Sequence, residues 1–280
     1  MTGAPWPAPG KLNLTLRVLG RREDGYHRLQ TLFQFIDYGD WLSFAPRADG
    51  QIRLSTEITG VSAASDLSVR AARRLQAATD CKLGADLSID KRLPLGGGLG
   101  GGSSDAATTL VALNRIWGTG LSEDDLAALG LALGADVPVF VRGRAAWGEG
   151  VGENLTPVEV AEPWYLVMAP ACAVSTAAVF ADPGLTRNSP SIKIADFLAG
   201  DDRNDCLGLV RLRYPAVADA LDWLGDFSRG RLTGTGACVF ATFGSAEEAH
   251  AVLNQAPAGL RGYVAKGMNR SPLLHRLAAS

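Results

Sequence analysis

The stretch of this chain that most restricts its fold is Leu93-Pro94-Leu95-Gly96-Gly97-Gly98-Leu99-Gly100-Gly101-Gly102-Ser103-Ser104-Asp105. A strand-like segment, 85–91, precedes it, and residues 106–117 after it carry apolar side chains at helical spacing. The backbone N–H groups of such a turn and the positive end of the helix dipole together favour a bound anion. A turn without a ligand is the alternative, but glycine this dense costs stability. We therefore predict a phosphate-binding loop, in which the hydroxyls of Ser103 and Ser104 cap the helix or donate to phosphate.

Two common nucleotide-binding patterns do not fit this loop. No lysine follows the glycines, so the pattern G-x-x-x-x-G-K-[ST] is absent. The dinucleotide fingerprint G-x-G-x-x-G is formally present at Gly96, Gly98 and Gly101, with Glu123 about 20 residues further on. A Rossmann unit needs a parallel strand after its helix, whereas a short turn and another helical segment follow Trp117. The sequence therefore argues against a Rossmann site.

Composition places the chain among folded proteins and outside the nucleic-acid binders. The 280 residues are 47% hydrophobic, which is enough apolar surface for a core, and the net charge is −2. A near-neutral chain lacks the excess of basic groups that bulk nucleic-acid binding needs. The 33 glycines exceed the about 20 that average usage would provide. Such an excess indicates places where the backbone turns sharply or approaches a ligand closely.

Cysteine spacing and hydropathy address the compartment. The four cysteines are far apart and form no C-x-x-C pair, which disfavours a structural zinc site and a disulfide scaffold. The longest apolar runs are about half of the roughly 20 residues that a membrane span needs. The first residues show neither the basic start nor the apolar core of a signal peptide. We therefore expect a cytoplasmic protein without a membrane segment.

Hydrophobic periodicity predicts an α+β fold with two domains, 1–155 and 156–280, each a β-sheet packed against helices. Residues 11–19 alternate strictly between polar and apolar side chains, as in a half-buried strand. Asp66 and Ser122 are placed to cap two helices, and Pro157 and Pro163 flank the expected domain boundary. Further predicted strands are 28–37, 51–58, 164–169, 237–243 and 262–266, further helices are 176–181, 215–227 and 246–255, and 139–141 and 144–147 are predicted to be extended.

Four segments together resemble the GHMP kinases. The glycine-rich stretch is similar to the ATP-binding loop of that family, and 8–14, 24–31 and 232–240 resemble its N-terminal, substrate and C-terminal glycine motifs in the same order. These motifs run from residue 8 to 240, and four motifs in this order make the resemblance highly specific. One departure is Asp105, where the family pattern has Asn. It would bring a carboxylate near the phosphates, which repels ATP unless a metal or a basic group offsets the charge.

The resemblance implies roles for two reacting groups. Asp136 would be the base that takes the proton of an acceptor hydroxyl, and Lys11 would stabilise the negative charge beside it. From the residues alone, the alternative for Lys11 is a solvated strand lysine. Asp136 could equally be a helix cap, because a proline follows at the second position. The residues that the resemblance assigns to ATP are Pro94, Leu95, Gly96, Gly97, Gly98, Leu99, Gly100, Gly101, Gly102, Ser103, Ser104, Lys91 and Asp66.

The resemblance also implies an acceptor site that recognises a cytosine base. Tyr26 would stack on the base, His27 would form hydrogen bonds to it, and Phe180 would supply an opposing ring. The alternative is a plain hairpin with an exposed aromatic side chain. Asn13 could bind acceptor hydroxyls, and Thr176 could add a polar contact. A second backbone nest over the phosphate or the acceptor would come from Thr233, Gly234, Thr235 and Gly236.

The function so implied is phosphoryl transfer in a cleft between the two domains. The similarity is greatest to the members that pass the γ-phosphoryl group of ATP to the 2-hydroxyl of a cytidine diphosphate-linked methylerythritol, in non-mevalonate isoprenoid synthesis. Mg²⁺ is expected with ATP, its ligands are not evident, and the protein would be a monomer or homodimer with no nucleic-acid partner. A mevalonate- or homoserine-type kinase is disfavoured by Gly25-Tyr26-His27, because those acceptors have no base. A non-catalytic nucleotide-binding module is disfavoured by Lys11 and Asp136.

Overall fold

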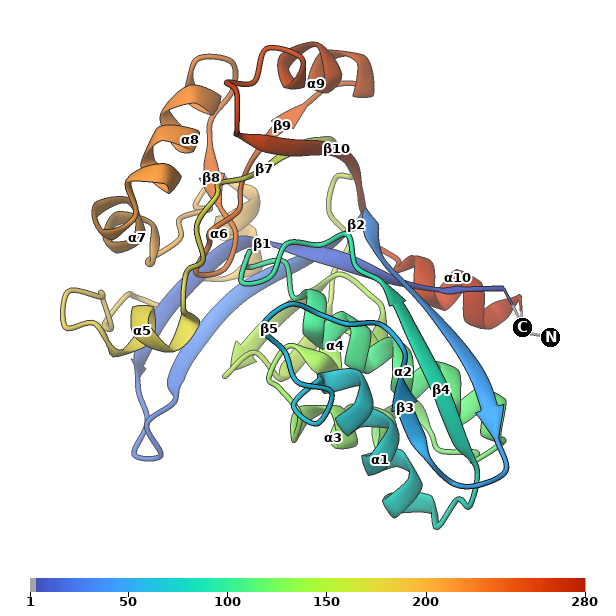
Figure 1. Cartoon of the computed structure of the whole chain (residues 1–280). Helices are drawn as coiled ribbons and strands as arrows, with labels where there is room; N and C mark the ends of the chain where they lie inside the picture. Colours follow the sequence, from blue (N-terminus) through green and yellow to red (C-terminus); the bar gives the residue numbers. More distant parts are fainter. Residues whose placement is uncertain (1–3, 280) are drawn as a thin grey trace.

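A long β-hairpin runs through the whole molecule (Figure 1). The computed structural model describes residues 4–279, and the hairpin consists of β1 (Trp6–Arg21) and β2 (His27–Arg47). The pairing is antiparallel from Trp6↔Leu42 to Arg21↔His27 and is interrupted by three irregularities. The strands predicted at 11–19 and 28–37 are therefore confirmed, and both are longer than predicted because they continue into both halves of the chain.

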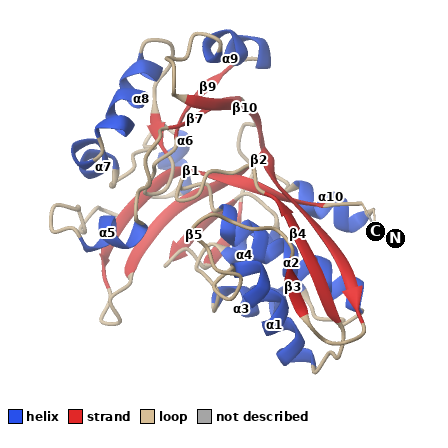
Figure 2. Cartoon of the chain, viewed as in Figure 1, coloured by secondary structure: helices blue, strands red, loops and turns tan. Residues whose placement is uncertain are grey.

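The N-terminal half is a sheet covered by helices on one face (Figure 2). Besides the hairpin, its strands are β3 (Ile52–Leu54), β4 (Gly84–Asp90), β5 (Ala146–Gly150) and β6 (Asn154–Pro157). Its helices are α1 (Leu67–Thr79), α2 (Gly101–Trp117), α3 (Glu123–Leu131) and α4 (Val137–Arg142). The last helix of the chain, α10 (Pro272–Ala278), returns to this half, where Leu273 joins its core. The described ends of the chain meet there, since Arg276 donates to the carbonyl of Ala4.

The C-terminal half is a second layer of strands and helices. Its strands are β7 (Trp164–Ala169), β8 (Arg231–Leu232), β9 (Val239–Phe243) and β10 (Arg261–Met268). Its helices are α5 (Thr176–Ala181), α6 (Ile194–Leu198), α7 (Leu207–Arg213), α8 (Pro215–Gly225) and α9 (Ala246–Leu253). β10 pairs with β7 and, through Gly267 and Met268, with β2, so the two halves share a continuous path of strands.

The hairpin also links the hydrophobic cores. Phe33 and Phe35 of β2 pack with α2 and α4, whereas Leu16 and Val18 of β1 pack with the helices of the C-terminal half. A third cluster between them contains Leu12, together with side chains of β7 and β9. The hairpin thus contributes side chains to the cores of both halves. Its middle lies where the two halves meet, and it therefore lines the cleft between them.

Local signals predicted several element ends correctly. Asp66 caps α1 by accepting from two backbone N–H groups, Ser122 begins α3 with a capping box, and β7 has the predicted bounds. The prediction that 139–141 is extended was wrong. These residues lie in α4, because Pro138 fits the second position of a helix and Gly143 ends it with φ +59°. Among the described residues, no helix is both long and apolar enough to cross a membrane.

The helix after the glycine-rich loop starts five residues earlier than the sequence predicts. α2 begins at Gly101, and its cap is Gly100, whose φ of +73° suits glycine. The expectation that Ser103 or Ser104 caps this helix was therefore wrong, because both already lie inside its first turn. The predictions also missed the short α6, α7 and α10, which the local pattern signals weakly.

Candidate active site

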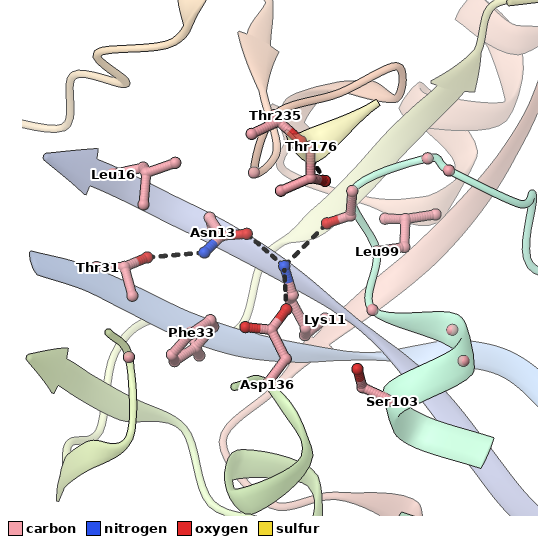
Figure 3. Close-up of a pocket in the computed structure, with 18 of the residues that line it drawn as sticks. Lys11, Asn13, Leu16, Thr31, Phe33, Leu99, Ser103, Asp136, Thr176 and Thr235 are labelled. Carbon is pink, nitrogen blue, oxygen red and sulfur yellow. Dashed lines mark hydrogen bonds and ion pairs between the residues drawn. The ribbon is translucent and has the colours of Figure 1, made fainter. Parts of the chain in front are cut away.

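The middle of the hairpin, the glycine-rich loop and the start of α4 surround a cavity of about 330 Å³. The side chains and loop residues that meet there come from both halves of the chain (Figure 3). Of the residues assigned to the site from the sequence, those lining this cavity are Lys11, Asn13, Lys91, Pro94, Leu95, Gly96, Gly97, Gly98, Leu99, Gly100, Gly101, Gly102, Ser103, Asp136, Thr176, Phe180, Gly234 and Thr235.

Lys11 and Asp136 face each other across this cavity. Lys11 Nζ lies 3.4 Å from Asp136 Oδ2, and Figure 3 shows the two side chains meeting below the glycine-rich loop. Asp136 holds the cap position of α4, but its side chain accepts no capping hydrogen bond. The cap interpretation of Asp136 therefore does not describe its carboxylate, which is turned toward Lys11 instead.

The ammonium group of Lys11 is held by two further acceptors. It donates to Asn13 Oδ1 and, at 2.9 Å, to the carbonyl of Gly98. Asn13 is fixed in turn, because its amide nitrogen donates to Thr31 Oγ1 at 2.8 Å. Asn13, assigned from the sequence to acceptor hydroxyls, thus has both ends of its side chain engaged, and it orients Lys11. Thr31 belongs to the segment 24–31 that resembles the substrate motif, but the sequence assigned it no individual role.

The glycine-rich loop turns its carbonyl groups into the protein. The carbonyls of Gly96 and Gly97 accept from the backbone N–H groups of Ala237 and Cys238, and that of Leu99 accepts from Lys11. The Gly98 carbonyl binds the side chains of Lys11 and Thr233. In contrast, within residues 4–279 none of the N–H groups of 95–103 donates a hydrogen bond. The loop therefore presents a row of donors without acceptors to the cavity, as an anion site requires.

The C-terminal glycine motif supports this loop from behind. Gly98 has φ +75°, and a Cβ atom on it would lie 2.2 Å from the carbonyl oxygen of Thr233. Thr233 is fully buried and does not line the cavity, and its hydroxyl accepts from the N–H of Asn13. Of the expected second nest, only Gly234 and Thr235 border the cavity. The motif therefore has two roles: Thr233 supports the glycine-rich loop, and Gly234 and Thr235 border the cavity.

The two serines of the loop have different surroundings. Ser103 lines the cavity, close to Asp136. The hydroxyl of Ser104 is buried and donates to the carbonyl of Pro9 at 2.7 Å, so it fastens α2 to β1. The structure therefore brings Ser103 to the site and keeps the side chain of Ser104 out of it.

A buried group of three charges lies beside the loop. Lys91 Nζ is 2.5 Å from Asp40 Oδ2 and 2.6 Å from Asp105 Oδ2, and Asp105 Oδ1 has no hydrogen-bond partner. Burial raises the pKa of Asp105 to about 7; Lys91 opposes this shift, and Asp40 adds to it. The expected repulsion between this carboxylate and phosphate is thus offset by Lys91. Nothing in the local sequence pattern pointed to Asp40.

Lys91 and Asp105 also border a smaller cavity of about 240 Å³ at the outer side of the loop. Its other lining includes the exposed Leu95, the α1 cap Asp66 and Ser68, whose buried hydroxyl has no hydrogen-bond partner. Apolar side chains next to unused polar atoms suit a flat heterocycle. Asp66 and Lys91, assigned to ATP from the sequence, are therefore brought together here.

A third cavity, of about 740 Å³, continues from Asp136 toward the tip of the hairpin. Tyr26, His27, Thr176 and Phe180 all line it. The rings of His27 and Phe180 are stacked, with centroids 5.0 Å apart, whereas Tyr26 is 63% exposed. Tyr26, His27, Thr176 and Phe180 thus meet in one place, although they come from opposite halves of the chain.

Among the described residues, no three His, Cys, Asp or Glu side chains gather in a geometry that could hold a metal ion. Asp136, the carboxylate that lines the loop cavity among the described residues, is already paired with Lys11. This arrangement offers no preformed cage, and it is compatible with a cation that arrives with phosphate oxygens as its main ligands.

Comparison with known proteins agrees with these features. The model of the GHMP kinases N terminal domain matches residues 66–144, and that of the GHMP kinases C terminal matches 192–262. The chain is 61% identical to the 4-diphosphocytidyl-2-C-methyl-D-erythritol kinase of Pseudomonas fluorescens (strain Pf0-1), over 96% of this chain and 95% of the relative. It is also 61% identical, with the same coverage, to the protein of that name from Pseudomonas aeruginosa (strain LESB58).

Solved structures give the same result. A crystal structure of 4-(cytidine 5'-diphospho)-2C-methyl-D-erythritol kinase, 31% identical, superposes with a TM-score of 0.81 over 95% of this chain and 99% of that one. A crystal structure of mevalonate kinase shares the fold alone, with 16% identity and a TM-score of 0.71 over 96% of this chain and all of that one. The sequence and the fold together show that this chain belongs to the GHMP kinases and, within them, to the family of 4-diphosphocytidyl-2-C-methyl-D-erythritol kinases.

Proposed function

We propose that the chain transfers the γ-phosphoryl group of ATP to the 2-hydroxyl of 4-diphosphocytidyl-2-C-methyl-D-erythritol, forming the 2-phosphate and ADP. The observation that carries this proposal is the position of the Lys11–Asp136 pair directly beside a loop whose N–H groups have no acceptor. A loop of this kind binds phosphate, and a carboxylate next to an ammonium group can take a hydroxyl proton. The product would serve non-mevalonate isoprenoid synthesis.

ATP binding would rest on the loop and on the smaller cavity of about 240 Å³ beside it. The N–H groups of 95–103 and the N-terminus of α2 would hold the phosphates, and Ser103 would add a hydroxyl. The smaller cavity, lined by Asp66, Lys91 and Leu95, would hold the adenine ring. Ser104 would act indirectly, since its hydroxyl fixes the start of α2 against β1.

Phosphoryl transfer depends on positioning and on charge neutralisation more than on covalent chemistry. The 2-hydroxyl would approach Asp136, whose carboxylate would accept its proton as the oxygen attacks the γ-phosphorus. Lys11 would stabilise the negative charge on the attacking oxygen and on the transferred group. Asn13 and the Gly98 carbonyl hold Lys11 in place, so this charge needs no reorientation during the reaction.

Mg²⁺ would enter with ATP and neutralise charge on its phosphates. Mg²⁺ commonly binds through substrate phosphates, waters and one or two protein oxygens. Asp136 and the hydroxyl of Ser103 are the groups of this chain that fit such a role. Two such groups suit an ion that is shared with the phosphates of ATP, and not a metal ion that the protein holds by itself.

The cytidine part of the acceptor would occupy the cavity of about 740 Å³. Its base would lie against the rings of Tyr26 and Phe180, with His27 as a hydrogen-bond partner and Thr176 nearby. Gly234 and Thr235 would border the methylerythritol end, where Thr176 and Thr235 share a hydrogen bond of 2.9 Å. The distance between this cavity and the loop would be bridged by the diphosphate.

We further propose that residues 1–155 and 156–280 form the two domains, with α10 packed against the first. A cytoplasmic location is supported by the four cysteines, all of which are free thiols. The chain would act as a monomer or homodimer.

A coupled assay for ADP tests the proposed function. We expect ADP production by the purified protein to require both ATP and the cytidine-linked acceptor. Mevalonate and homoserine serve as matched alternative acceptors. Turnover with either of them, or no turnover with the cytidine-linked acceptor, would contradict the proposal.

A further inference from the structure

Arg187 lies behind the acceptor cavity and connects its two sides. Its Nε–H donates to His27 Nε2 at 3.0 Å, while the rest of the guanidinium donates to the carbonyls of Phe180, Asp182 and Leu185. His27 begins β2, whereas Phe180 lies in α5 of the other half. A single half-buried guanidinium therefore binds the ring of His27 and the backbone of Phe180, and the rings of these two residues are stacked.

The contact with Arg187 determines where the proton of His27 lies. A guanidinium can only donate, so Nε2 of His27 must present its lone pair. In a neutral imidazole the proton then lies on Nδ1. Nδ1 has no hydrogen-bond partner among residues 4–279, and His27 lines the cavity. The donor that remains for a ligand is thus Nδ1–H.

The charges around His27 favour this neutral form. Burial lowers the pKa of His27, and the positive charges of Arg187 and Arg21 lower it further. Of the nearby acids, Asp182 pairs through its carboxylate with Arg213, and Asp24 pairs with Arg22. No carboxylate of the described chain is hydrogen-bonded to His27.

We propose that Arg187 is a positioning residue that holds His27 as the Nδ1–H tautomer, and that it thereby sets a preference for cytosine over uracil in the acceptor. This inference rests on the proposed function. The N3 atom of cytosine is an acceptor, whereas N3 of uracil carries a proton. A fixed Nδ1–H donor can pair with N3 of cytosine. With uracil the same donor would face the N3–H donor, and neither group would have an acceptor. Sites built to hydrogen-bond one partner reject the mismatched one strongly, because the polar groups are left unpaired.

The tautomer can be measured directly in the wild-type protein. The chain has three histidines, so long-range ¹H–¹⁵N spectra of wild type and of His27→Gln assign the His27 signals by difference. Above the pKa of His27, we expect the pattern of a protonated Nδ1 and an unprotonated Nε2. A protonated Nε2 would overturn the proposal. This measurement needs no Arg187 variant and no catalytic activity.

The preference for the base is tested with Arg187→Met and Arg187→Lys. Methionine removes the donor, so His27 can adopt either tautomer, and we expect the ratio of kcat/KM for the cytidine acceptor to that for its uridine analogue to fall at least tenfold. The change should lie mainly in the KM for the acceptor, with the KM for ATP nearly unchanged. Lysine can still donate to Nε2 and should retain most of the preference.

Arg211→Met is the matched control, because Arg211 forms an exposed ion pair with Asp222 away from the cavity. It should leave the ratio unchanged. If wild type turns over the cytidine acceptor while Arg187→Met keeps the full preference, the role of Arg187 is wrong and the proposed function stands. If wild type does not turn over the cytidine acceptor, the proposed function itself fails.

Discussion

Lys11 Nζ lies 3.4 Å from Asp136 Oδ2, and the two side chains are 4% and 35% exposed, respectively. The cation is therefore enclosed by the protein, whereas the carboxylate still faces the cavity. This asymmetry suits a reaction in which the substrate hydroxyl reaches the carboxylate and the ammonium group acts as a fixed charge. It also indicates that removing the charge of Asp136 should perturb the fold less than removing Lys11.

Replacing Asp136 with asparagine should remove the base and retain the shape of the side chain. We expect kcat to fall by about 10²- to 10⁴-fold. The Kd for ATP should stay near its wild-type value, because the loop donors are untouched. Steady-state kinetics and calorimetry with an ATP analogue measure the two quantities. An unchanged kcat would exclude Asp136 as the base.

Gly98→Ala should distort the phosphate loop. A Cβ atom there would meet the Thr233 carbonyl at 2.2 Å, in addition to the strain of an alanine at φ +75°. The matched control is Gly120→Ala, which has φ +71° and no atom within 4 Å of the new Cβ. The control should lower the free energy of unfolding by about 1–2 kcal/mol. Gly98→Ala should lower it further and should also weaken ATP binding. Equal losses in denaturant unfolding, with normal ATP affinity, would refute the close-approach argument.

Asp105→Asn should change how stability depends on pH. The carboxyl has a pKa of about 7 in the folded protein, against its ordinary pKa of 3.8, because burial disfavours its charged form. Between these values the folded state binds more protons than the unfolded state, so this group makes the protein less stable as pH rises. We therefore expect the free energy of unfolding of Asp105→Asn, relative to wild type, to increase from pH 5 to pH 8. Denaturant titrations at both pH values test this, and a difference independent of pH would contradict it.

Tyr26→Ala should weaken binding of the acceptor and leave binding of ATP unchanged. Tyr26 is 63% exposed and lines the cavity assigned to the base, so its removal should not affect the core. Loss of one stacked ring is worth about 1–3 kcal/mol, which predicts a rise of roughly 5- to 150-fold in the KM for the acceptor. Phe227→Ala, at an exposed ring far from these cavities, is the control. An effect restricted to the KM for ATP would rule out this assignment.

A structural feature can be predicted from the sequence when the residues that determine it lie close together in the chain. The loop, the cap at Asp66 and the capping box at Ser122 were predictable, because each depends on residues within a few positions. The extended prediction for 139–141 failed because its apolar residues suit a strand or a buried helix equally. Pro138 and Gly143 fit the ends of a helix, and the packing of these residues in the same core as α2 favours that helix.

By itself, the sequence determined where the backbone could present donors to an anion, since glycines at 96–102 followed by a helix do so in any fold. Only the tertiary structure decided which groups meet that anion. Lys11 reaches Asp136 because β1 passes next to the start of α4, and Arg187 reaches His27 because the start of β2 lies against α5. Such contacts depend on the register of long strands and on the packing of the two halves of the chain. Register and packing bring together residues that no local sequence pattern relates.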